Sequence, residues 1–480
     1  MGARCRWPVV LLVVLMLGAA VPCGSAYQQL PPAVGDADLF AAALEQDGFA
    51  VQEGKLQMFP IIDLYNMGLA PSCFGNNPST PYALFFVPPP PGWVAESEDP
   101  RDVATLDGKT LINYRLRHDE AIVMIGRTPP ACSYFSYRSY LYDRFFPATG
   151  ERRIVFASLG DTENLMTIKT SGTPDGQTGS PFDQTTVIVI TADQGIDQRV
   201  RAAAQAAGFP LSVINTDVIP SSLVNLGLEK DADKFVTILR LAFFENRQAG
   251  QAFMSNIPVR VFRLTPTESA PLDPYKMPAL RVRGTGDMSE FDLLGALEDL
   301  RQAILARHGS AKATELGTSV WLYEGPDAIQ RGINVIGENR DTTYLRSEDF
   351  TLPAGPNEFL IVYGVNHAAT GKATYANFGV YGAAGLNGVG AVSNYEFAGT
   401  AEEYIPGNPA AKYLYVWKVS RSCDGGPSCL TVPWGVKAYG LDLGKPGFIA
   451  FRAYLEPATK VGPSWSEIVY DRVIKFSGSD

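Results

Sequence analysis

Short runs in which apolar and polar residues alternate, or in which β-branched and aromatic residues dominate, make up most of the chain. This pattern is typical of β-strands, and Gly, Pro and Asn separate the runs. We predict strands at 82–87, 121–125, 134–142, 153–157 and 186–191 in the first part of the chain, and at 359–363, 373–381, 413–419, 448–455 and 467–476 in the second.

Two segments have helical spacing instead, and each opens one part of the chain. ADLFAAALEQDGF from Ala37 has Asp36 or Asp38 as an N-cap and Gly48 as a stop. FDLLGALEDLRQAILARHG from Phe291 carries Leu and Ile at helical intervals and also ends in glycine. We therefore predict a helix at the start of each part.

The chain contains a diverged copy of itself. GNNPSTPY at 75–82 matches GENRDTTY at 337–344, and both fit G-x-N-x-[SD]-T-x-Y. DEAIVMIG at 119–126 matches NEFLIVYG at 357–364, and continuing this match without a gap pairs Tyr137 with Tyr375. The two matches come in the same order, which favours duplication with one loop insertion around 93–111.

The predicted fold is mainly β with α+β additions: two related antiparallel sandwich or jelly-roll-like halves from an internal duplication. The first half is expected at 27–264 and the second at 289–480, joined by a Pro-rich linker at 265–288. Residues 187–264 mix helices and strands, and we interpret them as an α+β extension. Helices are expected at 197–207 and near Ala249, and strands at 211–214, 235–243 and 259–264.

The first 26 residues have the features of a signal peptide. Arg4 and Arg6 precede an apolar run, and small residues end at Ala26. The run is short for a membrane span, and no later stretch of the sequence is long enough. We expect a soluble mature protein, secreted to the extracellular space or periplasm after cleavage near Ala26, with no integral membrane span.

Composition excludes nucleic acid as a partner. The formal net charge is −10, and the basic residues are scattered rather than clustered.

Four cysteines follow the leader, an even number that favours two disulfides in an oxidising compartment. Cys423 and Cys429 bracket a short Gly-Pro loop and are expected to pair, which leaves Cys73 for Cys132. A zinc site is the weaker alternative, because the spacings lack C-x-x-C.

The repeated G-x-N-x-[SD]-T-x-Y is interpreted first as a turn device. Its Asn, Ser, Asp and Thr side chains bind nearby amides, and the Tyr hydroxyl returns to the backbone. The functional alternative puts Asp341 and Tyr344 at a ligand or cation, although Ser79 replaces the carboxylate in the other copy.

N-x-D-T-x-Y together with an aromatic strand such as SYFSYRSYLY resembles a feature of exported bacterial proteins of unknown function with paired β-sandwich domains. The resemblance covers two short segments in each half. It implies the paired-sandwich fold and carries no catalytic assignment.

Candidate chemistry is concentrated in the second half. VNHAATGKATY places Asn366 and His367 at one strand end and Lys372 and Tyr375 at the next, where His367 is a candidate general base. Ordinary loop composition is the competing interpretation.

FRAYLEP at 451–457 is the second candidate cluster. In an extended strand Arg452, Tyr454 and Glu456 share one face, where Arg452 would bind a carboxylate and Glu456 would exchange a proton. The alternative is a solvated ladder with an ion pair.

An aromatic stripe in the first half is a candidate ligand surface. Arg138 and Tyr140 share a strand face with other tyrosines, which suits either stacking on a ligand or packing between domains. The chain has only three histidines, and a multi-histidine metal site would need all three to meet from distant segments. No nucleotide, α/β-hydrolase or zinc-protease motif occurs. We therefore expect no metal and no organic cofactor.

Two functions are compatible with these residues. The first is an exported protein that binds a small molecule or glycan on an aromatic-lined β-sandwich face, with Asn366, Lys372, Tyr454, Asp341, Tyr344, Arg138 and Tyr140 as candidate contacts. The alternative is a secreted hydrolase or lyase that uses His367, Tyr375, Arg452 and Glu456.

Overall fold

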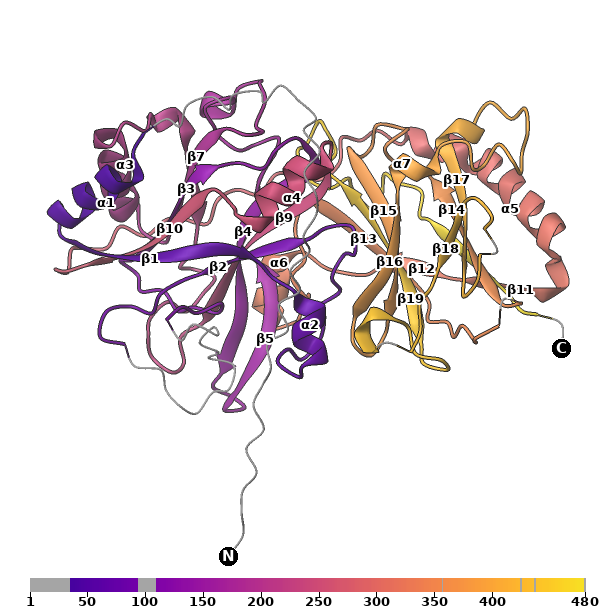
Figure 1. Cartoon of the computed structure of the whole chain (residues 1–480), viewed down its shortest axis with the longest axis horizontal. Helices are drawn as coiled ribbons and strands as arrows, with labels where there is room; N and C mark the ends of the chain where they lie inside the picture. Colours follow the sequence, from indigo (N-terminus) through magenta and orange to yellow (C-terminus); the bar gives the residue numbers. More distant parts are fainter. Residues whose placement is uncertain (1–34, 94–108, 356, 424, 436, 479–480) are drawn as a thin grey trace, which may run out of the picture. The chain divides into compact units, whose positions relative to one another are not determined.

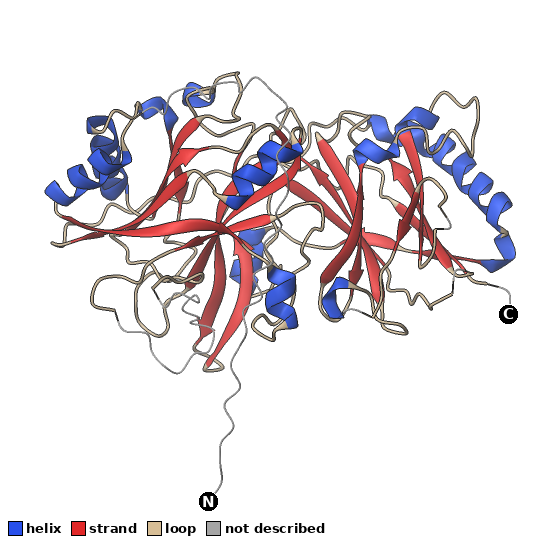
Figure 2. Cartoon of the chain, in the orientation of Figure 1, coloured by secondary structure: helices blue, strands red, loops and turns tan. Residues whose placement is uncertain are grey.

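The computed structural model describes residues 35–93, 109–355, 357–423, 425–435 and 437–478. The expected leader and most of the expected loop insertion lie outside these ranges. Strands dominate the described chain (Figure 2), and they form three sheets. In the described part, no helix is both long and apolar enough to cross a membrane. We call 35–266 the N-terminal half and 289–478 the C-terminal half.

The N-terminal half is built on one ten-stranded sheet with the order β5-β4-β9-β2-β1-β10-β3-β7-β8, and β6 pairs with β4. The strands are β1 Phe49–Met58, β2 Tyr82–Phe86, β3 Ala121–Arg127, β4 Cys132–Phe146, β5 Glu151–Ser158, β6 Glu163–Asn164, β7 Thr185–Thr191, β8 Ile214–Val218, β9 Lys234–Phe244 and β10 Val259–Pro266.

Strand β1 joins two parts of this sheet. Residues 49–54 pair with β10, and residues 55–58 pair with β2. Gly54 stands at the change of partner, where a Cβ atom would lie 2.3 Å from the Phe86 carbonyl oxygen. Only glycine permits this close approach.

The helices of this half are α1 Ala37–Gln46, α2 Ile61–Asn66, α3 Gln194–Ala206 and α4 Arg247–Ser255. The predicted first helix is confirmed: the Asp36 carboxylate accepts hydrogen bonds from the amides of Asp38 and Leu39, at 2.8 and 3.1 Å. Helices α1 and α3 lie side by side (Figure 1) and share an apolar cluster with β3, β7 and β10.

The C-terminal half has two five-stranded sheets, β11-β20-β14-β17-β18 and β12-β13-β19-β15-β16. The strands are β11 Ala313–Leu316, β12 Thr318–Val320, β13 Thr342–Ser347, β14 Phe359–Val365, β15 Tyr375–Gly382, β16 Asn387–Ser393, β17 Leu414–Ser420, β18 Cys429–Thr431, β19 Gly447–Tyr454 and β20 Arg472–Phe476. The helices are α5 Leu294–His308, α6 Gly325–Arg331 and α7 Asn394–Phe397.

Both sheets of the C-terminal half contribute to one core. Leu345, Phe378 and Ile449 from one sheet pack with Leu360 and Val473 from the other. Helix α5 covers the outer face of the first sheet through Leu297, Leu300 and Ile304. The second predicted helix is thus confirmed, and it ends at Gly309, whose φ is +92°.

Strand order is the same in the two halves. If β11 and β12 correspond to the two parts of β1, the sheet β1-β10-β3-β7-β8 matches β11-β20-β14-β17-β18, and β1-β2-β9-β4-β5 matches β12-β13-β19-β15-β16. The single parallel pair of each half, β7 with β8 and β17 with β18, falls at the same place.

Two predicted strands begin at least three residues later than expected. Residues 211–213 form a 3₁₀ turn and the strand begins only at Ile214, while the strand expected at 467–476 begins at Arg472. Within 187–264, β9 lies between β4 and β2, and β10 lies between β1 and β3. This segment therefore supplies interior strands of the sheet.

Candidate ligand-binding cavity

The repeated motif forms a tight loop before β2 and before β13. The Tyr82 hydroxyl accepts a hydrogen bond from the Asn77 amide at 3.0 Å, and the Tyr344 hydroxyl accepts one from the Asn339 amide at 3.2 Å. The predicted turn device is confirmed by these bonds, because each tyrosine closes its own loop.

Each loop also binds the opposite half, and the contacts are reciprocal. The Gly75 amide donates to the Leu386 carbonyl at 2.9 Å, and the Gly337 amide donates to the Phe156 carbonyl at 2.7 Å. Leu386 and Phe156 both have positive φ; Leu386 directly precedes β16, and Phe156 lies within β5. This exchange of like contacts has the pattern of an isologous interface.

Two buried arginines extend the reciprocity. Arg240 of β9 stands opposite Tyr82 in the sheet, and Arg452 of β19 stands opposite Tyr344. Arg452 Nη2 donates to the Gly75 carbonyl at 2.9 Å, and Arg240 Nη2 donates to the Gly337 carbonyl. Each arginine therefore holds the glycine loop of the other half.

The ladders also set the register between β4 and β15. Arg240 stands opposite Ser136, and Arg452 stands opposite Asn377. Tyr134, two residues before Ser136, therefore takes the place of Tyr375. The ungapped sequence match, which pairs Tyr137 with Tyr375, is three residues out of this register.

A cavity of about 910 Å³ lies beside these arginines. Its wall comes mainly from apolar and aromatic side chains of the N-terminal half, including Leu84, Phe86, Tyr142, Val236 and Ile238. Its volume is in the upper part of the range of about 300–1,000 Å³ that small-molecule sites occupy. Apolar surface of this extent favours an apolar ligand.

Exposed apolar side chains mark one side of the cavity. Met67 and Leu69, just after α2, line it and are 68% and 60% exposed. Helix α2 is tied to the C-terminal half, because Asn66 accepts a hydrogen bond from the Ala438 amide at 3.0 Å.

The corresponding face of the C-terminal half is packed with aromatic rings. Phe448 lies four residues before Arg452, where the N-terminal half has Val236 before Arg240. Phe448 stacks on Tyr381 at a centroid distance of 5.3 Å and contacts Trp321 edge-on at 5.2 Å. A ring thus occupies the position that Val236 holds at the cavity wall.

Three side chains singled out from the sequence line the cavity: Tyr344, Arg452 and Tyr454. Arg452 and Tyr454 share a face of β19, as predicted. Glu456 does not join them, because Leu455 has a φ of +49° and ends the strand. The alternation that would align Glu456 with Arg452 stops there.

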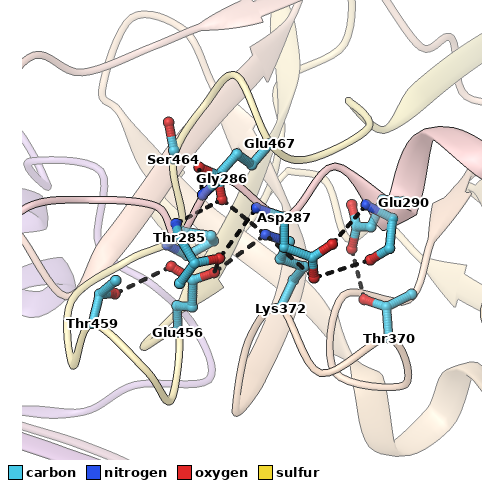
Figure 3. Close-up of polar contacts among 12 residues, drawn as sticks. Thr285, Gly286, Asp287, Glu290, Thr370, Lys372, Glu456, Thr459, Ser464 and Glu467 are labelled. Carbon is cyan, nitrogen blue, oxygen red and sulfur yellow. Dashed lines mark hydrogen bonds and ion pairs between the residues drawn. The ribbon is translucent and has the colours of Figure 1, made fainter.

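Glu456 instead belongs to a polar network with Lys372 (Figure 3). Lys372 Nζ lies 2.9 Å from Glu467 and 3.3 Å from Glu456. Burial opposes ionisation of Glu467, but hydrogen bonds from Lys372 and from the amides of Thr285 and Gly286 lower its pKa to about 2. The network ties the loops before β15, after β19 and before β20 to the segment before α5.

His367 lies neither at the cavity nor in the network around Lys372. Its Nδ1 is 2.9 Å from Glu290 Oε1, and its Nε2 is 3.6 Å from Asp471 Oδ2. Burial disfavours the charged ring, but the two carboxylates outweigh it and raise the pKa of His367 to about 10. The ring is therefore an imidazolium at neutral pH, which has no lone pair for general-base chemistry.

Tyr375 and Asp341 lie in the contact between the halves. The Tyr375 hydroxyl accepts a hydrogen bond from Asn377 at 2.9 Å, and Asp341 accepts hydrogen bonds from Tyr134, Thr162 and Asn164 at 2.6–2.8 Å. Both side chains are buried. The four side chains expected to act in catalysis thus have separate sets of partners.

The remaining candidates have structural partners. Asn366 accepts hydrogen bonds from the amides of Ala368 and Ala369, and Arg138 forms a buried ion pair with Asp217. Tyr140 is buried beneath Arg240, with the guanidinium carbon 5.1 Å from the ring centre.

Arg240 itself was missed in the sequence analysis. The sequence does contain a signal for it: Arg240 is the only charged residue after Lys234 in the otherwise largely apolar strand KFVTILRLAFF.

The four cysteines in the described ranges are divided between one bridge and two thiols. Cys423 and Cys429 form the predicted disulfide, with a Cα separation of 5.7 Å. The predicted bridge between Cys73 and Cys132 is wrong: both are free and buried. They pack in different apolar clusters, which the even number of cysteines could not reveal. Burial raises the pKa of both thiols to about 12.

Within the described ranges, no group of three or more His, Cys, Asp or Glu side chains is placed to bind a metal ion.

The chain matches no protein-family model and no curated protein sequence. Among solved structures it is similar to an uncharacterized protein from Burkholderia cenocepacia, with a TM-score of 0.38 and 13% sequence identity. The match covers 91% of this chain and 86% of that protein.

Proposed function

We propose that this protein binds an apolar small molecule in the cavity beside Arg240 and Arg452, whose wall comes mainly from the N-terminal half. The cavity of about 910 Å³ carries this proposal, because its wall is formed largely by leucine, isoleucine, valine and aromatic side chains. Such a wall suits an apolar body better than a glycan, whose hydroxyl groups need many polar partners.

Binding is favoured over hydrolase or lyase chemistry by the separation of the candidate catalytic groups. Arg452 lines the cavity, whereas His367 pairs with Glu290 and Glu456 pairs with Lys372. A general acid or base must lie within hydrogen-bond reach of the reacting atoms.

We further propose that the two halves are sandwich-like products of an internal duplication and that the protein is exported. Identical strand order and the reciprocal glycine and arginine contacts support the duplication. The Cys423–Cys429 disulfide and the leader-like sequence support export to an oxidising compartment.

Titration of the protein with 1-aminoanthracene, a neutral apolar fluorophore, tests the binding proposal. Fluorescence should rise on binding, and Val236→Phe should weaken binding by at least about tenfold, or about 1.4 kcal/mol, because it introduces the ring that Phe448 supplies in the other half. Val282→Phe is the matched control, since Val282 is 78% exposed outside the cavity.

Failure of the wild-type protein to bind the fluorophore would overturn the proposal. Equal binding by wild type and Val236→Phe would also overturn it, because the fluorophore would then lie elsewhere.

A further inference from the structure

The cavity carries an excess of positive charge. Of the described residues that line it, Lys55, Arg240 and Arg452 are cationic and Asp63 is the only acid. The Asp63 carboxylate accepts a hydrogen bond from the Tyr439 hydroxyl. An apolar wall with surplus cations is suited to a ligand that is both apolar and anionic.

Arg240 is a lining cation with unsatisfied donors. It is only 6% exposed, and its Nη2 donates to the Gly337 carbonyl. Its Nε and Nη1 atoms are buried without a hydrogen-bond acceptor among the described residues. A guanidinium has five donor hydrogens and stays charged in proteins, so unpaired donors in an apolar site are costly.

No neighbouring side chain neutralises this charge. In the described ranges, no carboxylate lies within ion-pair distance of Arg240, and the nearby Glu338 is held by the Ser158 amide and hydroxyl at 3.1 and 2.6 Å. Burial raises the pKa of Tyr140 and of Tyr344, so these phenols stay neutral beside the guanidinium.

Arg452 provides the contrast within the same cavity. Its Nη1 donates to the Tyr381 hydroxyl at 2.6 Å and its Nη2 to the Gly75 carbonyl at 2.9 Å. Among the described residues, Arg240 lacks both an acceptor for its Nε and Nη1 donors and an opposite charge. A ligand carboxylate supplies both.

We propose that the ligand is an amphipathic monocarboxylate whose headgroup binds Arg240 while its hydrocarbon or aromatic body fills the apolar cavity. This inference rests on the proposed function, because it assigns the chemistry of a ligand in the same cavity. A single anionic charge matches a site in which one arginine has unsatisfied donors, whereas phosphate groups are usually held by several cations.

Calorimetric titration with dodecanoate, 1-dodecanol and dodecyl phosphate, each below its micelle-forming concentration, tests the assignment. Dodecanoate should bind about 10- to 100-fold more tightly than 1-dodecanol, because a hydrogen-bonded charge pair is added to the same apolar contact. Dodecyl phosphate should bind more weakly than dodecanoate.

Arg240→Gln should remove the preference for dodecanoate while leaving the affinity for 1-dodecanol within about threefold of wild type. Arg240→Lys keeps the charge and should retain part of the preference. Arg260→Gln is the matched control, since Arg260 lies in the same sheet but pairs with Glu53 and Asp38 and does not line the cavity.

The outcomes separate the two proposals. Equal affinity of wild type for dodecanoate and 1-dodecanol, or an unchanged preference in Arg240→Gln, overturns the carboxylate assignment and leaves apolar binding standing. Tighter binding of dodecyl phosphate also overturns it. Absence of binding by both dodecanoate and 1-dodecanol overturns both proposals. If Arg240→Gln does not fold, the wild-type comparison of the three ligands decides.

Discussion

The corresponding faces of β9 and β19 differ in what fills them. Around Arg452 the C-terminal half packs Trp321, Tyr381 and Phe448 against one another. Around Arg240 the N-terminal half has Val236 and an open cavity. The same strand order thus supports a closed aromatic stack in one half and a ligand-sized space in the other.

The difference shows which features of the scaffold serve folding and which remain for binding. Each half has one glycine loop with its tyrosine and one buried arginine, and the arginine of each half binds the loop of the other. The side chains that decide whether space remains beside the arginine differ between the halves. We therefore expect the shared loop contacts to contribute similarly to stability in the two halves, and the side chains that differ, such as Val236 and Phe448, to change ligand binding or packing in one half only.

The largest effect is expected from truncating Phe448. Phe448→Ala should lower the free energy of unfolding by about 3–5 kcal/mol, because it removes a fully buried ring and leaves a new cavity. Val236→Ala should cost only about 1–2 kcal/mol, since two methyl groups are lost beside space that already exists. Urea unfolding measures both, and equal losses would break the contrast.

A second large difference in stability is expected between two ion pairs at matching places in the two halves. Arg263 and Glu120 lie 2.5 Å apart and are fully buried, whereas Lys475 and Glu358, at the matching positions of β20 and β14, lie 2.9 Å apart and are partly exposed. Glu120→Ala should cost about 3–5 kcal/mol and Glu358→Ala at most about 1 kcal/mol.

Thermal and urea unfolding of these two variants checks the comparison. A loss in Glu358→Ala as large as that in Glu120→Ala would show that exposure does not set the value of this pair.

A pH effect on stability is expected from His367. Its pKa is about 10 in the folded protein and about 6.5 when unfolded, so its stabilisation is complete below pH 6.5 and is lost as pH rises toward 10. The difference in unfolding free energy between wild type and His367→Gln should shrink by about 1–3 kcal/mol from pH 6 to pH 9.

His308→Gln is the control for that titration. Burial lowers the pKa of His308, so its effect has the opposite sign: stability is lost as pH falls through its unfolded pKa. A His367→Gln difference that is constant across pH 6–9 would contradict the assigned imidazolium.

The smallest effects should be equal in the two halves. Tyr82→Phe and Tyr344→Phe each remove one hydroxyl that accepts a loop amide, and each should cost about 1 kcal/mol. Unfolding midpoints measure this, and a difference above about 1 kcal/mol would show that the two loops are not equivalent supports.

The sequence alone was informative wherever the physical cause is local. Asp36, the glycine stops and helical spacing located the helices near the start of each half, and alternation located most strands within a few residues. The local Cys423–Cys429 bridge followed from its short loop. The turn role of the repeated motif followed from side chains that bind their own backbone.

Contacts between residues that lie far apart in the chain could not be predicted from the sequence alone. The match of Tyr137 to Tyr375 missed the register that the ladders set, and cysteine parity missed that Cys73 and Cys132 lie in different clusters. Strand alternation also could not foresee the positive φ at Leu455, which turns Glu456 away from Arg452.

The sequence by itself determined the β-rich character, the helices and the doubled motif, because these depend on neighbours along the chain. Only the tertiary structure decided that Arg240 and Arg452 hold each other's loops and that Val236, rather than an aromatic ring, borders the space beside Arg240. A cavity depends on which side chains from distant strands fail to meet, and no local pattern records that.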